Sequence, residues 1–217
     1  HNALRPAFAP YRPAGASQAP NIDWVGFEGG VVEIGHDGNG FAFDCEGPRH
    51  QALIRPFRLA SRLVTNGEWK AFIADGGYQR ADLWLSDGWA TINQRDWSAP
   101  LYWEEIDGAW HAMSLSGLHP VEDAAPVCHV SHYEADAFAT WSGKRLPTEP
   151  EWETAAGSVP PQGNTLGSDL LRPAPAQGQG LQQMFGDVWE WTQSPYVPYP
   201  GFKPAAGAVG EYNGKFM

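Results

Sequence analysis

Two tyrosines late in the chain are the residues whose type and spacing first suggest chemistry. Tyr196 and Tyr199 stand three positions apart in the run YVPYPGF, shortly after a Trp-Glu-Trp run. Prolines on either side exclude a helix, because proline fixes φ and removes a backbone donor. A stiff loop can hold a phenol in place, and a phenol stays protonated at neutral pH and can act as an acid within hydrogen-bond reach. Two interpretations remain open: functional hydroxyls, or rings that pack at the surface.

The histidines and cysteines do not have the spacing of a metal site. No H-x-x-x-H or H-E-x-x-H pair occurs. His129 and His132 are three apart, but they straddle an expected strand end and a helix cap, which favours capping or packing over metal binding. Cys45 and Cys128 are too few for a thiolate site and lack the sequence context of a nucleophile. We interpret both as free thiols in small buried positions, and we assign no metal ligand to this chain.

Composition and charge narrow the functional class. The net charge of −11 argues against binding to nucleic acid and to anionic membranes, since both require a basic face. No apolar run is long enough for a transmembrane helix, and the first residues do not form a signal peptide. Together with two free thiols, these features predict a cytoplasmic protein. The 11 tryptophans, 25 glycines and 19 prolines indicate a loop-rich globular fold filled by large aromatic rings.

Three helices that could position these residues begin with the same local signal. Capping boxes of the form S/T-x-x-E occur at Thr65, Ser131 and Thr148, and each is followed by a short segment that ends at glycine. They predict helices near 66–75, 132–142 and 149–156. Trp69 and Phe72 share one face of the first helix and are candidate core residues.

The rest of the chain predicts short strands and loops. Residues 1–20 are rich in Pro and Ala and indicate a linker, while 21–217 would form the folded domain. The run WVGFEGGVVEIG fits a hairpin of strands, and IDGAW fits a hairpin turn within a long irregular segment, 78–126. Short strands with separated short helices are typical of an α+β fold.

Several runs resemble the formylglycine-generating-enzyme (sulfatase-modifying factor) family. APVCHVSHYEADAFATWSGKRLPTEPEWETAAG, followed by MFGDVWEWT, matches the pattern P-V-x-x-V-S, G-x-R-L-P-T-E-x-E-W-E and G-N-V-W-E-W, with Asp187 in place of the usual Asn. The resemblance covers residues from about 21 to the end and implies a C-type-lectin-like α+β core with little regular structure. Because V-W-E-W recurs across the family, Trp189 and Trp191 are expected to be core residues.

Within that family, FAFDCEGPRH, LWLSDGWATI, PLYWE and the Y-x-x-Y loop look like the C-terminal domain of ergothioneine-biosynthesis sulfoxide synthases. The resemblance implies a non-haem Fe(II) enzyme that joins γ-glutamylcysteine or cysteine to trimethylhistidine with O2. Its iron ligands would come mainly from an N-terminal four-helix domain of the DinB type, so His1 is not nominated as a ligand. The family also continues beyond EYNGKFM, so a shortened C-terminus is expected, and with it no copper-binding cysteines.

The same resemblance assigns roles to the two tyrosines. Tyr196 matches the residue thought to donate a proton to oxygen, and Tyr199 matches a neighbour on the substrate side. Two alternatives stay open: an ovothiol-type sulfoxide synthase, and a lectin-like module that binds a small molecule without catalysis. By itself, this segment is expected to be inactive.

Overall fold

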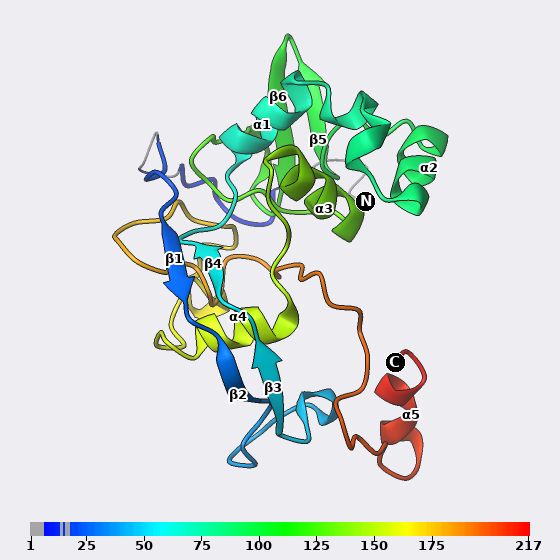
Figure 1. The fold of residues 1–217 in the computed structure, drawn as a ribbon. Helices are drawn as coiled ribbons and strands as arrows, with labels where there is room; N and C mark the ends of the chain where they lie inside the picture. Colours follow the sequence, from blue (N-terminus) through cyan, green and yellow to red (C-terminus); the bar gives the residue numbers. More distant parts are fainter. Residues whose placement is uncertain (1–6, 14, 16–17) are drawn as a thin grey trace. The chain divides into compact units, whose positions relative to one another are not determined.

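The computed structural model describes residues 7–13, 15 and 18–217 (Figure 1). The strands are Trp24–Phe27 (β1), Gly30–Ile34 (β2), His50–Ile54 (β3), Phe57–Ala60 (β4), Trp103–Ile106 (β5), Ala109–Ser114 (β6) and Gly117–Pro120 (β7). The α-helices are Asn66–Ala74 (α1), Ser86–Gln94 (α2), His132–Trp141 (α3), Glu149–Ala156 (α4) and Ala208–Gly214 (α5). Short 3-10 helices span Asp44–Glu46 (η1), Gly77–Gln79 (η2), Ala81–Leu83 (η3) and Leu166–Ser168 (η4).

The strands form three small sheets, which confirms the predicted α+β class with little regular structure. β1 pairs with β4, β2 pairs with β3, and β5, β6 and β7 form an antiparallel meander. The hairpin expected at IDGAW is present as β5 and β6. The hairpin expected within WVGFEGGVVEIG is wrong, because β1 and β2 each pair with a later strand. Between β1 and β2, Gly29 has φ +72°, and a Cβ at this position would lie 2.3 Å from the carbonyl oxygen of Ile54. Only glycine fits this conformation and this close contact with the backbone.

All three predicted capping boxes are formed. The backbone N–H of Glu68 donates to Thr65 Oγ1 at 3.2 Å, and the Glu68 carboxylate accepts from the Thr65 backbone at 2.8 Å. The same reciprocal pair begins α3 and α4. The predicted helices at 66–75, 132–142 and 149–156 therefore match α1, α3 and α4 to within one residue. Local side-chain spacing was sufficient to locate them.

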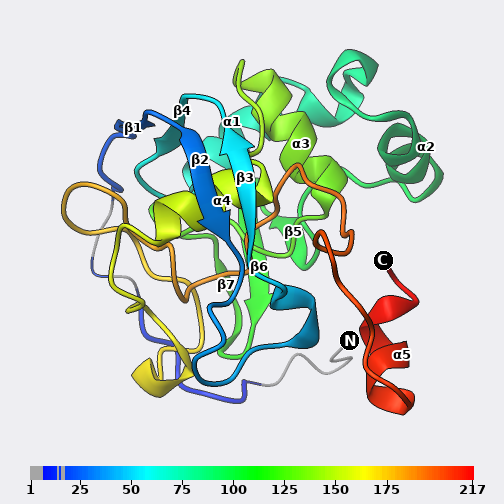
Figure 2. The same cartoon turned by 60° about the horizontal axis from the view of Figure 1, so that its bottom comes forward.

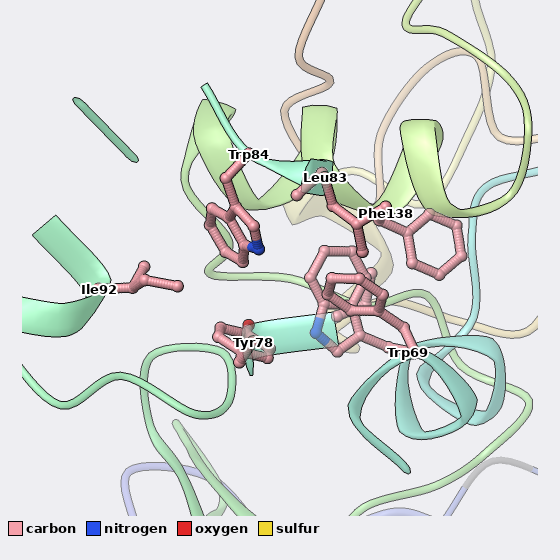
Figure 3. Packing of buried hydrophobic residues seen from close by; sticks show 9 residues of the cluster. Trp69, Tyr78, Leu83, Trp84, Ile92 and Phe138 are labelled. Carbon is pink, nitrogen blue, oxygen red and sulfur yellow. The ribbon is translucent and has the colours of Figure 1, made fainter. Parts of the chain in front are cut away.

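The chain divides into two compact units. The larger comprises the described residues of His1–Val25 together with Ala60–Leu146 and Pro161–Trp191, and the smaller comprises Gly26–Leu59, Pro147–Pro160 and Thr192–Met217. The core of the larger unit is an aromatic cluster contributed by α1, α2, α3 and the segment between them (Figure 3). Trp69 stacks on Phe138 with ring centroids 4.9 Å apart, and the buried Tyr78 hydroxyl donates to Glu134 at 2.7 Å.

Helix α2 corrects the expectation of irregular structure over residues 78–126. Its sequence, SDGWATINQ, has a glycine inside it, and its N-cap, Leu85, makes no side-chain capping bond. Tertiary packing explains the helix: Ile92 is buried in the aromatic cluster, and a Cβ at Gly88 would lie 2.6 Å from the Tyr133 Cβ of α3. The glycine that lowers helix propensity thus permits close contact between α2 and α3.

The smaller unit is built around the β2–β3 hairpin, with α4 packed against both strands (Figure 2). Its core is Ile34, Ile54 and Phe57, and Phe27 stacks on Phe57 at 4.8 Å. Glu153 of α4 accepts a hydrogen bond from the Gly35 backbone at 2.7 Å, which ties the helix to the end of β2.

Two predictions about the chain's organisation remain as they were. The linker at residues 1–20 and the domain at 21–217 stay predictions, and His1 lies outside the described residues. Among the residues that the structure describes, no helix has both the length and the apolarity needed to cross a membrane.

Candidate active site

The loop that carries the two tyrosines is fastened to the beginning of α4. The Gln193 backbone donates to Pro147 O at 2.7 Å, and the Glu149 backbone donates to Ser194 Oγ at 3.0 Å. Residues 195–199 have no regular secondary structure, which confirms the non-helical loop expected from its prolines. The loop runs on towards α5 (Figure 2).

A tight turn fixes the loop immediately after Tyr199. The Phe202 N–H donates to Tyr199 O at 2.9 Å, and Gly201 has φ +85°. Proline followed by glycine at a positive φ is the sequence that a type II turn requires. The turn therefore fixes the backbone of Tyr199, and other contacts fix its side chain.

Tyr199 is anchored by its hydroxyl and by its ring. The hydroxyl donates to Glu149 Oε1 at 3.1 Å, and the ring packs on the Ile34, Ile54 and Phe57 core. The His50 ring meets it edge-on at a centroid distance of 4.6 Å. Burial, and then the negative charge of Glu149, raises the pKa of this phenol. Tyr199 therefore keeps its proton and directs it at a carboxylate.

Tyr196 is placed differently, with half of its surface (50%) exposed. Burial, and then the neighbouring Cys45 side chain, raise the pKa of Tyr196 to about 12. The phenol is thus protonated at neutral pH and open to a ligand.

Cys45, which acts on the pKa of Tyr196, lies on η1, the short 3-10 helix after the β2 strand. The Glu46 carboxylate accepts from the Phe43 backbone at 2.8 Å, and the His36 N–H donates to Glu46 O at 2.8 Å. The side-chain amide of Asn213, on α5, donates to Asp44 Oδ1. These bonds hold both neighbours of Cys45, so the position of its thiol is set by the backbone.

The surroundings of the two phenols are acidic. Asp44, Glu149 and Glu153 all lie close enough to act on the ionisation of one phenol or the other. In addition, Asp44 Oδ2 and His36 Nε2 are buried, and no described residue forms a hydrogen bond with either atom. Since buried polar atoms are normally paired, these two are available to a ligand or water. The arrangement can present a proton from Tyr196 beside negative charge that attracts a cation.

The histidines that the sequence singled out are engaged with aromatic rings. His129 meets Tyr102 edge-on at 5.0 Å, and His132, the first residue of α3, meets Trp191 at 5.8 Å. Burial lowers the pKa of His129. Across residues 7–13, 15 and 18–217, no three His, Cys, Asp or Glu side chains come together in a way that could hold a metal ion.

Three sequence-based assignments need correction. Trp189 and Trp191 were expected in the core, yet Trp189 is 99% exposed and Trp191 is 49% exposed, with its indole N–H donating to Val130 O. Burial depends on what packs against a residue, and a recurring motif does not specify that. Both cysteines are free thiols, as expected, but each is only partly buried, so neither occupies the small buried position that was expected.

The sequence indicated Tyr196 and Tyr199 but not Glu149, the hydrogen-bond partner of Tyr199. Glu149 sits in the R-L-P-T-E run, whose capping Thr148 and Glu151 were recognised, so its place at a helix start was available from the sequence.

Comparison with known proteins finds a family domain and several similar full-length proteins. The sulfatase-modifying factor enzyme 1-like domain matches residues 12–169. Hercynine oxygenase of Mycolicibacterium thermoresistibile is 40% identical over 187 residues, covering 76% of this chain and 41% of that protein. Hercynine oxygenase of Mycobacterium tuberculosis is 39% identical over 186 residues, covering 75% and 43%. Formylglycine-generating enzyme of Bos taurus is 28% identical over 261 residues, covering 99% and 69%. The chain spans about two fifths of the length of these hercynine oxygenases.

Proposed function

This chain belongs to the family of sulfatase-modifying factor enzyme 1-like domains, and on that basis we propose that it is the C-terminal catalytic and substrate-binding domain of a sulfoxide synthase of ergothioneine biosynthesis. The observation that carries the proposal is the higher identity to hercynine oxygenases, 40%, than to the bovine formylglycine-generating enzyme, 28%. Hercynine is trimethylhistidine, so the substrate named for those relatives is the one that the Y-x-x-Y resemblance implies.

The proposed reaction joins a thiol to the imidazole ring of trimethylhistidine. The S–H of γ-glutamylcysteine or cysteine and one ring C–H are lost, a C–S bond forms, and the sulfur gains one oxygen atom from O2. The second oxygen atom leaves as water with the two hydrogens, so atoms and electrons balance. Sulfur and the ring carbon are oxidised, and O2 is reduced.

The acidity around Tyr196 and Tyr199 supports a cationic substrate. The quaternary ammonium of trimethylhistidine carries a permanent positive charge and no hydrogen-bond donor, so it is held by carboxylates at a distance and by aromatic faces. Glu149 and Glu153 supply negative charge beside Tyr199, and Asp44 supplies it beside Tyr196. We assign Tyr199 to the wall of the substrate site and not to proton transfer, because its proton is directed at Glu149.

Tyr196 would supply a proton where oxygen gains negative charge. With a pKa of about 12, its phenol is ionised to only about 1 part in 10⁵ at pH 7, and it gives up its proton only to a strongly basic oxygen. Its half-exposed position leaves the hydroxyl open to a bound reactant.

The proposal includes Fe(II), which would activate O2 when bound, but the described residues do not fit an iron site. They bring no three potential ligands together. We therefore assign the ligands to the DinB-like N-terminal domain implied by the resemblance, and we route no step of this chain's chemistry through the metal.

Product analysis tests this function. The chain is combined with the DinB-like domain, supplied with Fe(II), O2, trimethylhistidine and either γ-glutamylcysteine or cysteine, and the products are identified by mass spectrometry. We expect a sulfoxide that carries one oxygen atom from O2. Histidine in place of trimethylhistidine is the matched control, because it lacks the permanent cation, and it should react much more slowly.

Three outcomes would contradict the proposal. A product with sulfur on the other imidazole carbon, the one substituted in ovothiol, would identify an ovothiol-type sulfoxide synthase. Conversion of a peptide cysteine to formylglycine would identify the other activity named among the relatives. Tight binding of trimethylhistidine with no product from either thiol would indicate a binding module.

A further inference from the structure

We infer that residues 8–12 form a strap anchored on the larger unit, and that this strap positions the polypeptide that precedes it. Part of the segment whose composition predicted a linker is therefore docked. The docking itself is independent of any reaction. Its consequence for catalysis rests on the proposed function, in which the preceding polypeptide carries the DinB-like iron domain.

The strap is held by its backbone at both ends. The N–H groups of Phe8 and Ala9 both donate to Leu115 O, at 2.6 and 3.0 Å, in the turn between β6 and β7. At the other end, the Arg172 guanidinium donates to Arg12 O. A proline lies between these points, and its ring fixes φ, so the strap loses less conformational entropy on docking than a flexible linker would.

Tyr11 holds the middle of the strap. Its ring stacks on His119 of β7, with ring centroids 3.8 Å apart and planes 15° from parallel. His119 Nε2 donates to Ser116 O at 2.8 Å, which fixes the orientation of the imidazole under the phenol ring. The Tyr11 hydroxyl donates to Glu122 Oε1 at 2.6 Å, a short hydrogen bond to a charged acceptor. One side chain thus supplies both a ring contact and a charged hydrogen bond.

The surface that receives Tyr11 is fixed by the fold. Glu122 and Arg172 form an ion pair at 3.2 Å, with 22% and 14% of their side chains exposed. Asn66, at the start of α1, donates to Glu122 O at 2.9 Å, and Asn164 donates to Arg172 O at 2.8 Å. Because both charged side chains are largely removed from water, their bonds to the strap stabilise it more than those of an exposed pair would.

Burial of apolar surface contributes little to this docking. The Phe8 side chain is 81% exposed, and Tyr11 itself is 37% exposed. The strap is therefore attached through its backbone hydrogen bonds and through the contacts of Tyr11. Docking should depend strongly on this one side chain, and Phe8 provides a matched control in the same segment.

Anchoring at residue 8 shortens the connection to the preceding polypeptide. Further along the chain, Arg62 Nε donates to Pro20 O at 2.6 Å, so the chain stays attached there when the strap is released. Release then moves the anchor from residue 8 to residue 20 and lengthens the connection by 12 residues. Because effective concentration falls roughly as the −3/2 power of linker length, lengthening a short connection by this much lowers it several-fold. A docked strap therefore favours the meeting of the two domains.

Hydrogen exchange tests the docking in this chain alone. The Phe8 and Ala9 amides should be protected in the wild type, because both donate to Leu115 O. Tyr11→Ala should reduce their protection by about tenfold or more, and Tyr11→Phe, which keeps the stack on His119, should reduce it less. Phe8→Ala is the control, and it should leave the protection of the Ala9 amide unchanged.

The amides of α1 verify that the larger unit keeps its fold in each variant. Two results would overturn the strap, whatever the activity of the protein. One is exchange of the Phe8 and Ala9 amides at the rate of a free peptide in the wild type. The other is unchanged protection of these amides in folded Tyr11→Ala.

An insertion in the two-domain enzyme tests the positioning role. Gly and Ser residues are inserted after the exposed Gly15, between the strap and Pro20. With the strap docked, the insertion does not lengthen the upstream connection, so the rate of sulfoxide formation should stay at the wild-type value. Tyr11→Ala should lower that rate several-fold, and with the strap released, an insertion of about twelve residues should lower it about twofold more. A purely structural role of Tyr11 would not make the rate depend on the insertion.

The outcomes separate the strap from the proposed function. A sulfoxide rate in Tyr11→Ala that does not change with the insertion would overturn the positioning role and leave the proposed function intact. If the wild-type enzyme makes no sulfoxide, the proposed function fails, and small-angle X-ray scattering of the same four proteins decides the positioning role. The maximum dimension should then increase when Tyr11 is replaced, and equal dimensions with and without the replacement would overturn it.

Discussion

At the scale of single residues, two tyrosines of the same loop have been given different chemistry by their neighbours. Tyr199 directs its proton at Glu149 and rests its ring on the apolar core, whereas Tyr196 is half exposed beside Cys45. Both phenols have a raised pKa, but only Tyr196 offers its hydroxyl to a bound molecule. The proposed roles of Tyr196 as proton donor and Tyr199 as substrate wall are based on these different surroundings.

Tyr196→Phe should change which product the complete enzyme makes. The variant keeps the ring and its packing but has no proton to supply, and a positioned acid typically contributes about 10²–10⁴ in rate. We expect sulfoxide formation to fall sharply while oxidation of the thiol persists or grows. The measurement is the ratio of sulfoxide to oxidised thiol at saturating substrates. A wild-type ratio and rate would show that Tyr196 only packs.

Tyr199→Phe should weaken substrate binding and have less effect on the product ratio. Removing the hydroxyl leaves Glu149 Oε1 without its donor and frees the ring from its fixed orientation. A weakening of roughly 1 kcal/mol, which is about fivefold in the KM for trimethylhistidine, is expected. Glu149→Gln, which removes charge but keeps shape, should weaken binding of the cation at least as much. An unchanged KM in both variants would contradict the assignment of this wall.

At the scale of elements, Glu68 in the first turn of α1 belongs both to a capping box and to an ion pair. The Arg62 guanidinium is nearly buried, with 6% of its side chain exposed, and donates to both Glu68 oxygens at 2.9 and 3.0 Å. Glu68 also caps the Thr65 backbone. The carboxylate therefore satisfies a buried cation and a helix N-terminus together.

Glu68→Gln should destabilise the protein by about 3 kcal/mol, because it leaves the Arg62 charge buried without its counter-charge. Asp123→Asn is the matched control: it removes the partner of Lys70 at 2.6 Å, but Asp123 is 61% exposed, and the loss should be about 0–1 kcal/mol. Urea unfolding measures both. Equal losses of stability in the two variants would show that burial does not make the Arg62–Glu68 ion pair more important than the exposed one.

The difference in the free energy of unfolding between wild type and Glu68→Gln should depend on pH. Burial acts to raise the pKa of Glu68, but the hydrogen bonds from Arg62 and the Thr65 backbone outweigh it, and the folded pKa is lowered. A lowered folded pKa stabilises the protein fully above the unfolded value of 4.5, and this stabilisation is lost as pH falls through the folded pKa. The two proteins should therefore approach each other in stability below about pH 4.5.

At the scale of the whole molecule, the prediction concerns iron. The sequence contains no H-x-x-x-H pair, and the described residues form no cluster of three potential ligands. Because three converging ligands are needed to hold such an ion tightly, we expect this chain alone to bind iron poorly and to make no sulfoxide. Iron content after anaerobic reconstitution and desalting measures this, with the DinB-containing enzyme as the positive control. Close to one tightly held iron per chain would refute it.

Features encoded within a few residues of each other could be predicted from the sequence alone. The three capping boxes join positions i and i+3, so α1, α3 and α4 were located without reference to the rest of the chain. Proline and glycine set backbone angles directly, which is why the non-helical loop at 195–199 and the turn after Asp107 could be predicted. The pattern of short strands and separated helices also predicted the α+β class, and the family resemblance then added the C-type-lectin-like core and the roles of Tyr196 and Tyr199.

Tertiary structure alone decided the features that depend on distant partners. Helix α2 lacks a side-chain cap and forms because Ile92 is buried and Gly88 admits α3. Trp189 is exposed in spite of its motif, since local sequence does not state what covers a ring. The hydrogen bond from Tyr199 to Glu149 joins residues 50 positions apart, and no local pattern in the sequence encodes that contact.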